Sequence, residues 1–336
     1  MNTANQFQYF IVTIFIITLI SCTLKAKNGL VSNGVSTTKT TPLTKAMHTL
    51  KNKQLSVTIL TKGAELSSIK TDSLEYLWQA NPKVWPRHAP ILFPIVGRLI
   101  DHEYIYKGKT YPMKQHGFAR DRNFEVVEAT KNSILFKQVS TAETKKIYPF
   151  DFVLKVAYTL QNNRLIIEYT VKNPSENEDL YFSIGAHPAF NCPLETNQKR
   201  SDYELVFDKK IAPKGQINNK GLFEGDSLLV FTKKGIIKIT DSLFNHDSFA
   251  FNPNLFSKVT FVHKPTHKKY VSISFKNFPY LGIWSKRNVA SYVCIEPWYG
   301  IADRKNHNKD FTQKEGIQKL APSNTFTCSF TIEVFE

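Results

Sequence analysis

The sequence predicts an all-β protein built as a large antiparallel β-sandwich, and three observations support this. Short stretches of alternating apolar and polar residues recur from residue 55 onward, which is the pattern of half-buried strands. The chain has 25 Phe and 14 Tyr against 14 Gly, and aromatic residues favour pleated sheets. No helical segments alternate with the strands, as a parallel α/β sheet would require.

The predicted strands follow one another along the chain. They cover residues 55–60, 124–129, 133–140, 152–174, 203–208, 235–241, 258–263, 269–275, 281–285, 291–298 and 324–336. We expect 152–174 to form a hairpin, because its two β-rich runs flank Gln161-Asn162-Asn163 and Asn suits a tight turn. The chain has 336 residues and shows no internal repeat, so we expect residues 50–336 to form one domain.

The first 49 residues are predicted to direct export. Residues 10–20 form an uncharged apolar run that is shorter than the about 20 residues of a membrane span and typical of a signal peptide. Leu19–Cys22, "LISC", resembles a bacterial lipobox, so residues 1–22 are expected to be a signal peptide and Cys22 a lipidation site. No Lys or Arg precedes residue 10, which leaves plain secretion and an uncleaved anchor open. Residues 23–49 are expected to be a flexible tether.

These segments predict where the protein lies. We expect it in the periplasm or attached to the outer membrane of a bacterium, with membrane contact only through its N-terminal lipid or signal segment. The four cysteines form no C-x-x-C pair, and the three beyond Cys22 are an odd number, so no disulfide scaffold is indicated.

The net charge of +16 raises the question of an anionic partner. The lysines are scattered singly or in pairs, and no basic helix, zinc-finger spacing or RNA-binding aromatic motif accompanies them. We therefore predict no nucleic-acid partner, although a phosphorylated small molecule stays open.

Four stretches interrupt the alternation with polar residues. "PILFPIVGRL" (90–99) carries Arg98, "QHGFARDRNFEV" (115–126) carries His116, "GAHPAF" (185–190) carries His187, and "VCIEPWYGIADR" (293–304) carries Glu296. Each has an ordinary structural interpretation on its own: a surface arginine, loop histidines, and an edge-strand glutamate. Together they supply a carboxylate, two imidazoles and a guanidinium, which is a set that can perform acid–base chemistry on a neutral polar substrate.

Metal and serine chemistry are not predicted. The two histidines and the glutamate lie far apart in the sequence without an H-x-x-x-H pair, and an arginine beside them would repel a cation. No G-x-S-x-G motif is present for a serine nucleophile. We therefore expect neither a metal nor another cofactor.

Five motifs taken together, "FPIVGRL", "HGFAR", "GAHPAF", "FPYLGIWS" and "CIEPWYGIADR", resemble the aldose 1-epimerase (galactose mutarotase-like) family, and within it the LacX-like branch. The resemblance extends from about residue 50 to the C-terminus. It implies the large antiparallel β-supersandwich of that family. It also implies interconversion of the α and β anomers of a free hexose through ring opening.

The resemblance also implies roles for single residues. Glu296 would be the base that takes the proton from the C1 hydroxyl, and His187 the acid that protonates the ring oxygen. His116 and Arg98 would bind the substrate. The aspartate that holds a sugar hydroxyl would be Asp247, with Asp241 as its competitor.

Further details stay open at this point. Trp298 would either stack on the sugar or belong to the core, and Asp303 and Arg304 are expected to form an ion pair beside the site. Two other functions compete with that of a mutarotase acting as a monomer on a free aldose. One is a hexose-6-phosphate 1-epimerase, and the other is a non-catalytic carbohydrate-binding lipoprotein.

Overall fold

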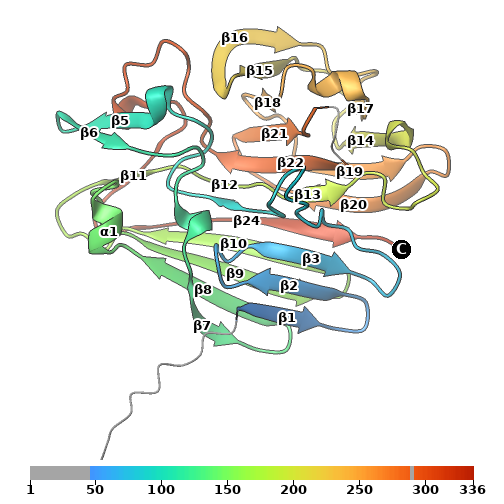
Figure 1. Cartoon of the computed structure of the whole chain (residues 1–336), viewed down its shortest axis with the longest axis horizontal. Coiled ribbons are helices and arrows are strands. Elements are labelled where there is room, and N and C mark those ends of the chain that lie inside the picture. The colour runs from blue at the N-terminus through green and yellow to red at the C-terminus, as the bar shows by residue number, and fades with distance from the viewer. Residues whose placement is uncertain (1–45, 288–290) are drawn as a thin grey trace, which may run out of the picture. The chain divides into compact units, whose positions relative to one another are not determined.

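The computed structural model describes residues 46–287 and 291–336 of the chain (Figure 1). The signal peptide and the lipidated Cys22 are predictions that lie outside these residues, as does most of the tether. The tether was expected to reach residue 49, but strand β1 begins at Met47, so the folded domain starts earlier. Met47–Lys51 pairs along its whole length with the next strand, a contact that its polar composition did not indicate. No helix among the described residues has the length and apolar character to cross a membrane.

A nine-stranded sheet forms one layer of the domain. Two neighbouring strands of this sheet form the predicted hairpin, β9 (Val153–Gln161) and β10 (Arg164–Lys172), which turns at Asn162 with a positive φ of 53°. In spatial order the strands are β17 (Ile236–Lys238), β14 (Tyr203–Phe207), β19 (Lys258–His263), β20 (Lys268–Ser274), β24 (Thr325–Val334), β10, β9, β8 (Ser133–Val139) and β7 (Glu125–Ala129).

A second large sheet carries the candidate site. Its long strand is β22 (Tyr292–Tyr299), which pairs with β21 (Tyr280–Trp284) on one side and with both β12 (Ile184–Ala186) and β13 (Ala189–Asn191) on the other. The remaining strands of this sheet are β16 (Leu222–Leu228), β15 (Gly215–Asn219), β18 (Phe249–Phe251) and β4 (Ile91–Leu92).

Smaller elements complete the domain. The strands are β1 (Met47–Lys51), β2 (Ser56–Leu60) and β3 (Leu66–Lys70) in one sheet, β5 (Glu103–Tyr106) with β6 (Lys109–Pro112), and β11 (Leu180–Phe182) with β23 (Gln318–Leu320). The helical turns are α1 (Ala142–Lys145), η1 (Ile100–His102), η2 (Ala119–Asp121), η3 (Arg200–Asp202), η4 (Asp241–Phe244) and η5 (Phe311–Gln313). Every ladder between these named strands is antiparallel, which confirms the predicted all-β class.

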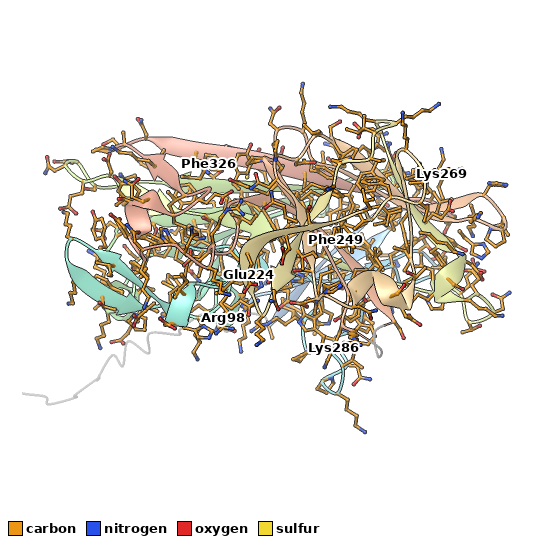
Figure 2. All side chains as sticks on the ribbon, turned by 90° about the horizontal axis from the view of Figure 1, so that it is seen from above. Arg98, Glu224, Phe249, Lys269, Lys286 and Phe326 are labelled. Carbon is orange, nitrogen blue, oxygen red and sulfur yellow. The ribbon has the colours of Figure 1, made fainter. Side chains whose placement is uncertain are left out.

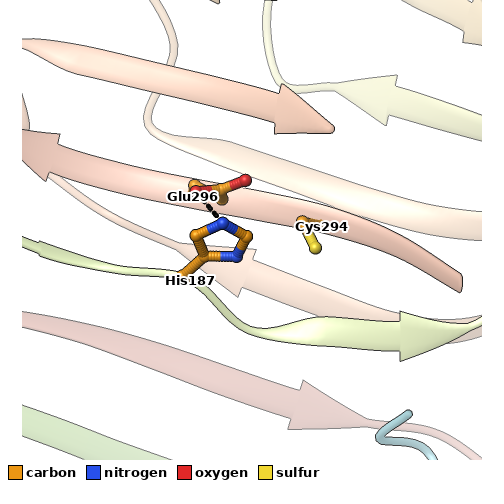
Figure 3. Close-up of side chains that lie close together, drawn as sticks. All are labelled: His187, Cys294 and Glu296. Carbon is orange, nitrogen blue, oxygen red and sulfur yellow. Dashed lines mark ion pairs between the residues drawn. The ribbon is translucent and has the colours of Figure 1, made fainter. Parts of the chain in front are cut away.

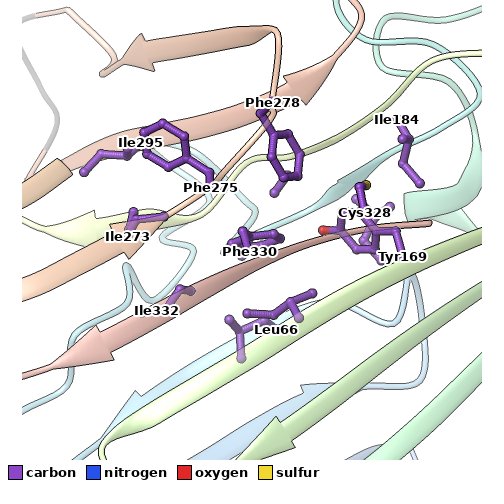
Figure 4. Close-up of a cluster of buried hydrophobic side chains, with 14 of the residues drawn as sticks. Leu66, Tyr169, Ile184, Ile273, Phe275, Phe278, Ile295, Cys328, Phe330 and Ile332 are labelled. Carbon is purple, nitrogen blue, oxygen red and sulfur yellow. The ribbon is translucent and has the colours of Figure 1, made fainter. Parts of the chain in front are cut away.

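The core lies between the sheets (Figure 4). Phe330 and Ile332 of β24 face it from one layer, and Ile295 of β22 faces it from the other. Because side chains alternate along a strand, Val293 and Ile295 enter this core while Cys294, Glu296 and Trp298 point to the opposite face of β22. The apolar residues of β22 thereby anchor the strand and present its polar and aromatic residues on the other face.

Candidate active site

Strand register brings His187 and Glu296 together. Gly185 of β12 pairs with Trp298, and Ala189 of β13 pairs with Cys294. The two short strands therefore pair with β22 in the same register, and His187, which lies between them, is placed opposite Glu296. The His187 Nε2 atom lies 3.2 Å from Glu296 Oε2 (Figure 3). Both residues are buried, with exposed fractions of 6% and 1%.

A cavity of about 560 Å³ lies over this pair. Its polar wall includes His116, Asp247 and Asn218 together with His187 and Glu296. Its aromatic wall includes Trp85, Trp284, Trp298 and Phe223. A concave site with apolar walls and a few convergent polar groups is the usual form of a small-molecule site.

Two glycines make room for Trp298. A Cβ atom at Gly185 would lie 2.6 Å from the indole, and one at Gly282 would lie 2.2 Å from it, far inside the carbon–carbon contact distance of about 3.5–4.0 Å. The indole therefore lies against the two strands that flank β22. Trp298 is 5% exposed and still lines the cavity, so it belongs both to a buried cluster and to the site.

His116 lies next to the pair. Its ring centroid is 5.5 Å from that of His187, and its Nδ1 accepts a hydrogen bond of 3.1 Å from the backbone N–H of Gly97. The other ring nitrogen, Nε2, lies 3.2 Å from the side-chain amide nitrogen of Gln115. The tight turn behind it requires glycine, because Gly117 has a φ of +70° and a Cβ there would lie 2.2 Å from the Phe93 carbonyl oxygen.

The structure distinguishes the two candidate aspartates. Asp247 lines the cavity, and its Oδ1 accepts a 2.7 Å hydrogen bond from the indole N–H of Trp284. Burial raises the pKa of Asp247, opposed by that indole N–H and by the backbone of Ser248. The Asp241 side chain is 81% exposed and lies 3.6 Å from Arg200, away from the cavity lining.

Arg98 is placed differently from the sequence expectation. Its guanidinium donates to the backbone carbonyl of Lys220, and its stem packs against Gly221 at the turn that leads into β16. Figure 2 labels Arg98 among the side chains of the protein. It is absent from the cavity lining, although the preceding Gly97 is part of it. The glycine before Arg98, Gly97, has a φ of +76°, and a Cβ atom there would lie 2.4 Å from the Cβ of Ala302, so this turn requires glycine.

Asp303 and Arg304 do not pair with each other, which corrects the expectation. Asp303 lies 3.1 Å from the Lys314 ammonium, both side chains being 1% exposed, and Arg304 pairs with Glu315. Adjacent side chains of an extended chain point in opposite directions, so Asp303 and Arg304 pair with different residues. The Lys314 ammonium also donates to the Ile301 carbonyl, and the Asp303 Oδ2 accepts from the Ile100 N–H. These contacts join three separate segments of the chain.

Several lining residues had not been identified from the sequence. Arg120 belongs to the motif that supplied His116, and Trp284 belongs to "FPYLGIWS", so both were within quoted segments. Trp85, Arg87 and Lys286 had no local signal. The backbone of Trp85 is held by Trp78, whose indole N–H donates a 2.9 Å hydrogen bond to the Trp85 carbonyl oxygen.

Burial controls the charge of the central pair. It raises the pKa of Glu296 well above the usual carboxyl range; the charge of Asp247 adds to this, and the indole of Trp298 opposes it. Burial lowers the pKa of His187 to about 3, and the positive charges of Arg120 and Arg87 contribute in the same direction. Burial therefore favours a neutral imidazole beside a protonated carboxyl group, a pair with one transferable proton and one proton acceptor.

Comparison with known proteins shows the family to which the chain belongs. The model of the aldose 1-epimerase family matches residues 46–315. The plasmid-encoded protein LacX of Lactococcus lactis subsp. lactis is 34% identical over 294 residues, which are 85% of this chain and 98% of LacX.

Two solved structures are similar in fold and sequence. A galactose mutarotase related enzyme from Lactobacillus acidophilus has a TM-score of 0.81 and 37% identity, covering 86% of this chain and 97% of that one. A galactose mutarotase-like protein from Lactobacillus casei has a TM-score of 0.80 and 31% identity, covering 86% of this chain and 100% of that one.

Proposed function

Because the chain belongs to the aldose 1-epimerase family, we propose that it interconverts the α and β anomers of a free hexose. The observation that carries this proposal is the contact of 3.2 Å between His187 Nε2 and Glu296 Oε2 at the bottom of an aromatic-walled cavity. A site that only bound sugar would not need two buried groups with opposite pKa shifts at hydrogen-bond distance from each other.

The proposed reaction needs one proton to leave and one to arrive. Glu296 takes the proton from the C1 hydroxyl, and His187 gives a proton to the ring oxygen. The C1–O5 bond breaks as the C1 carbonyl forms, which yields the open-chain aldehyde. After rotation about C1–C2 the same steps run in reverse on the other face, and each group then recovers its initial state.

This assignment requires a proton on His187 when the sugar reacts, whereas burial favours the proton on Glu296. The two groups are in contact, so the proton can pass between them without leaving the site. The pair is therefore best treated as one unit that holds a single proton. His116 and Asp247 are proposed to bind sugar hydroxyls, and Trp298 to contact the sugar ring.

Polarimetry tests the proposal. Freshly dissolved α-D-glucose or α-D-galactose should reach rotational equilibrium faster with the purified chain than in buffer alone. Sugar binding without any acceleration would favour the alternative, a non-catalytic carbohydrate-binding protein.

A second candidate, a hexose-6-phosphate 1-epimerase, is favoured by one observation. Arg87, Arg120 and Lys286 all line the cavity, and such cations would bind a phosphate group. Arg87 is paired with Asp121 at 2.7 Å, so part of this charge is already neutralised. A higher kcat/KM for glucose 6-phosphate than for glucose would support this candidate, and the reverse order would support the free hexose.

The protonation of His187 and Glu296 predicts how activity depends on pH. The active form holds one proton, so activity is lost when a second proton binds His187 at low pH and when Glu296 loses its proton at high pH. Because the pKa of His187 is lowered to about 3, kcat/KM should stay nearly constant from pH 7 down to well below the usual histidine range near pH 6.5. A steep fall of kcat/KM between about pH 7 and pH 5.5, within that usual range, would contradict this expectation.

The N-terminal sequence supports a further proposal, that the protein is exported and that Cys22 carries a lipid. A lipid chain adds about 0.8 kcal/mol of membrane affinity per buried methylene group. Residues 10–20 are fewer than the about 20 residues that a membrane span needs. Mass spectrometry of the mature N-terminus should find a lipid-modified Cys22, and Cys22→Ser should remain as precursor. An unmodified N-terminus beyond Cys22 would indicate plain secretion, and an intact Met1 would indicate an anchor.

A further inference from the structure

A buried thiol lies beside the catalytic pair, and the proposed reaction does not use it. Cys294 and Glu296 are two residues apart on β22 and share the face that His187 approaches from the neighbouring segment. One potential ligand atom from each of the three side chains lies within 4.8 Å of the other two, and all three residues are buried (Figure 3).

The three side chains offer different donor atoms: an imidazole nitrogen, a sulfur and a carboxylate oxygen. Zn²⁺ accepts all three types and is commonly held by three protein ligands with a fourth position open to water. Here that fourth position would face the cavity that His187 and Glu296 line. The spacing of these residues in the sequence gave no indication of the cluster, because His187 is more than a hundred residues from the other two.

Proton balance permits such a site. Thiol and carboxyl groups bind a metal ion in their deprotonated form, so Cys294 and Glu296 would each give up a proton to the solvent when a cation binds. A divalent cation would replace these two protons, which leave to solvent, and the neutral imidazole would add its lone pair. One thiolate, one carboxylate and one divalent cation sum to zero charge, which avoids a net charge in a buried site.

We propose that His187, Cys294 and Glu296 bind a thiophilic divalent cation such as Zn²⁺, and that the bound ion reversibly inhibits the enzyme. Inhibition follows because the ion occupies the two groups that carry protons in the reaction. The inhibition rests on the proposed function, whereas the binding does not.

The surroundings predict which ions bind. Arg120 and Arg87 place positive charge near His187, and this charge repels a bound cation. Only a cation that forms strong bonds with imidazole and thiolate ligands would overcome the repulsion. Mg²⁺ and Ca²⁺ prefer several oxygen ligands and gain little from sulfur or imidazole. Zinc holds nitrogen at about 2.0–2.1 Å and sulfur at about 2.3 Å, so donors that lie up to 4.8 Å apart must move closer to one another when the ion binds.

Binding is tested by absorbance with Cd²⁺ as the probe, because a cadmium–thiolate bond gives an ultraviolet charge-transfer band. All samples carry Cys22→Ser, which removes the thiol outside the described residues. We expect a band that saturates at one equivalent, disappears on adding Zn²⁺ and is unaffected by Mg²⁺. Cys294→Ser and Cys294→Ala should abolish it, whereas the matched controls Cys328→Ser and Cys192→Ser, at the other buried thiols, should retain it.

Inhibition is tested by polarimetry on the same samples. Saturating Zn²⁺ should slow mutarotation by about 10²-fold or more, and EDTA should restore the rate. Cys294→Ser should keep the basal rate and lose most of the sensitivity to Zn²⁺.

Either of two results would overturn the proposal: no saturable Cd²⁺ band in the protein with Cys294 intact, or a band that both Cys294 variants retain. If the Cys294 variants do not fold, the two control variants still identify the thiol. A band that survives both Cys192→Ser and Cys328→Ser must come from Cys294, the one cysteine of the described residues left intact in both. A saturable band without any mutarotase activity would support the binding site and count against the proposed function alone.

Discussion

Replacing Glu296 with glutamine is expected to slow mutarotation by about 10²–10⁴-fold while leaving the fold intact. Glutamine has the shape of the protonated carboxyl group that burial favours, and its amide can occupy the position 3.2 Å from His187 Nε2 that the Glu296 Oε2 atom holds. It cannot release or accept a proton at neutral pH. The variant therefore removes the chemistry and keeps the contact.

Polarimetry with α-D-glucose measures this effect, and the thermal unfolding midpoint shows whether the fold is preserved. Glu128→Gln, at an exposed position of β7, is the matched control and should keep the wild-type rate. If Glu296→Gln retained a rate close to that of the wild type, Glu296 would not be the proton carrier.

His187→Asn is expected to cause a loss of similar size, about 10²–10⁴-fold. Asparagine keeps a polar group opposite Glu296 but cannot be protonated. It also removes the ring that stacks on Trp85 with a centroid distance of 5.0 Å, so circular dichroism must accompany the kinetics. The control is His263→Asn, at another buried histidine, which contacts Thr266 and does not line the cavity.

The two substitutions combined provide a sharper test. If Glu296 and His187 act as one proton-carrying unit, the double variant should be hardly slower than either single variant, because the second change removes a group that no longer has a function. Multiplied losses would show that the two residues act independently, and the mechanism would then be wrong in its central feature.

The strands were predictable from the sequence where they are long and half-buried. The hairpin of β9 and β10 is an example, since strict alternation and the Asn turn define it within 23 consecutive residues of the predicted segment, 152–174. Short strands such as β4 and β13 were not predicted. They have too few residues to show a period, and they exist because β12 and β22 offer them backbone partners.

The candidate site was predictable in part. His187, Glu296, His116, Asp247 and Trp298 were all identified beforehand, and the structure places them around one cavity. Arg98 lies elsewhere, and Trp85, Trp284, Arg87 and Lys286 were missed. Nothing local distinguishes a cavity tryptophan from a core tryptophan, because both are large, apolar and flanked by strand residues.

The sequence by itself determined the all-β class, the strand pattern and the types of residue available for proton transfer, because these depend on local periodicity and side-chain chemistry. Only the tertiary structure decided which of those residues meet. The shared register of β12 and β13 on β22 places His187 against Glu296, and the same strand face adds Cys294. Burial then shifts the pKa values of the histidine and the glutamate in opposite directions, an effect of desolvation that no sequence pattern contains.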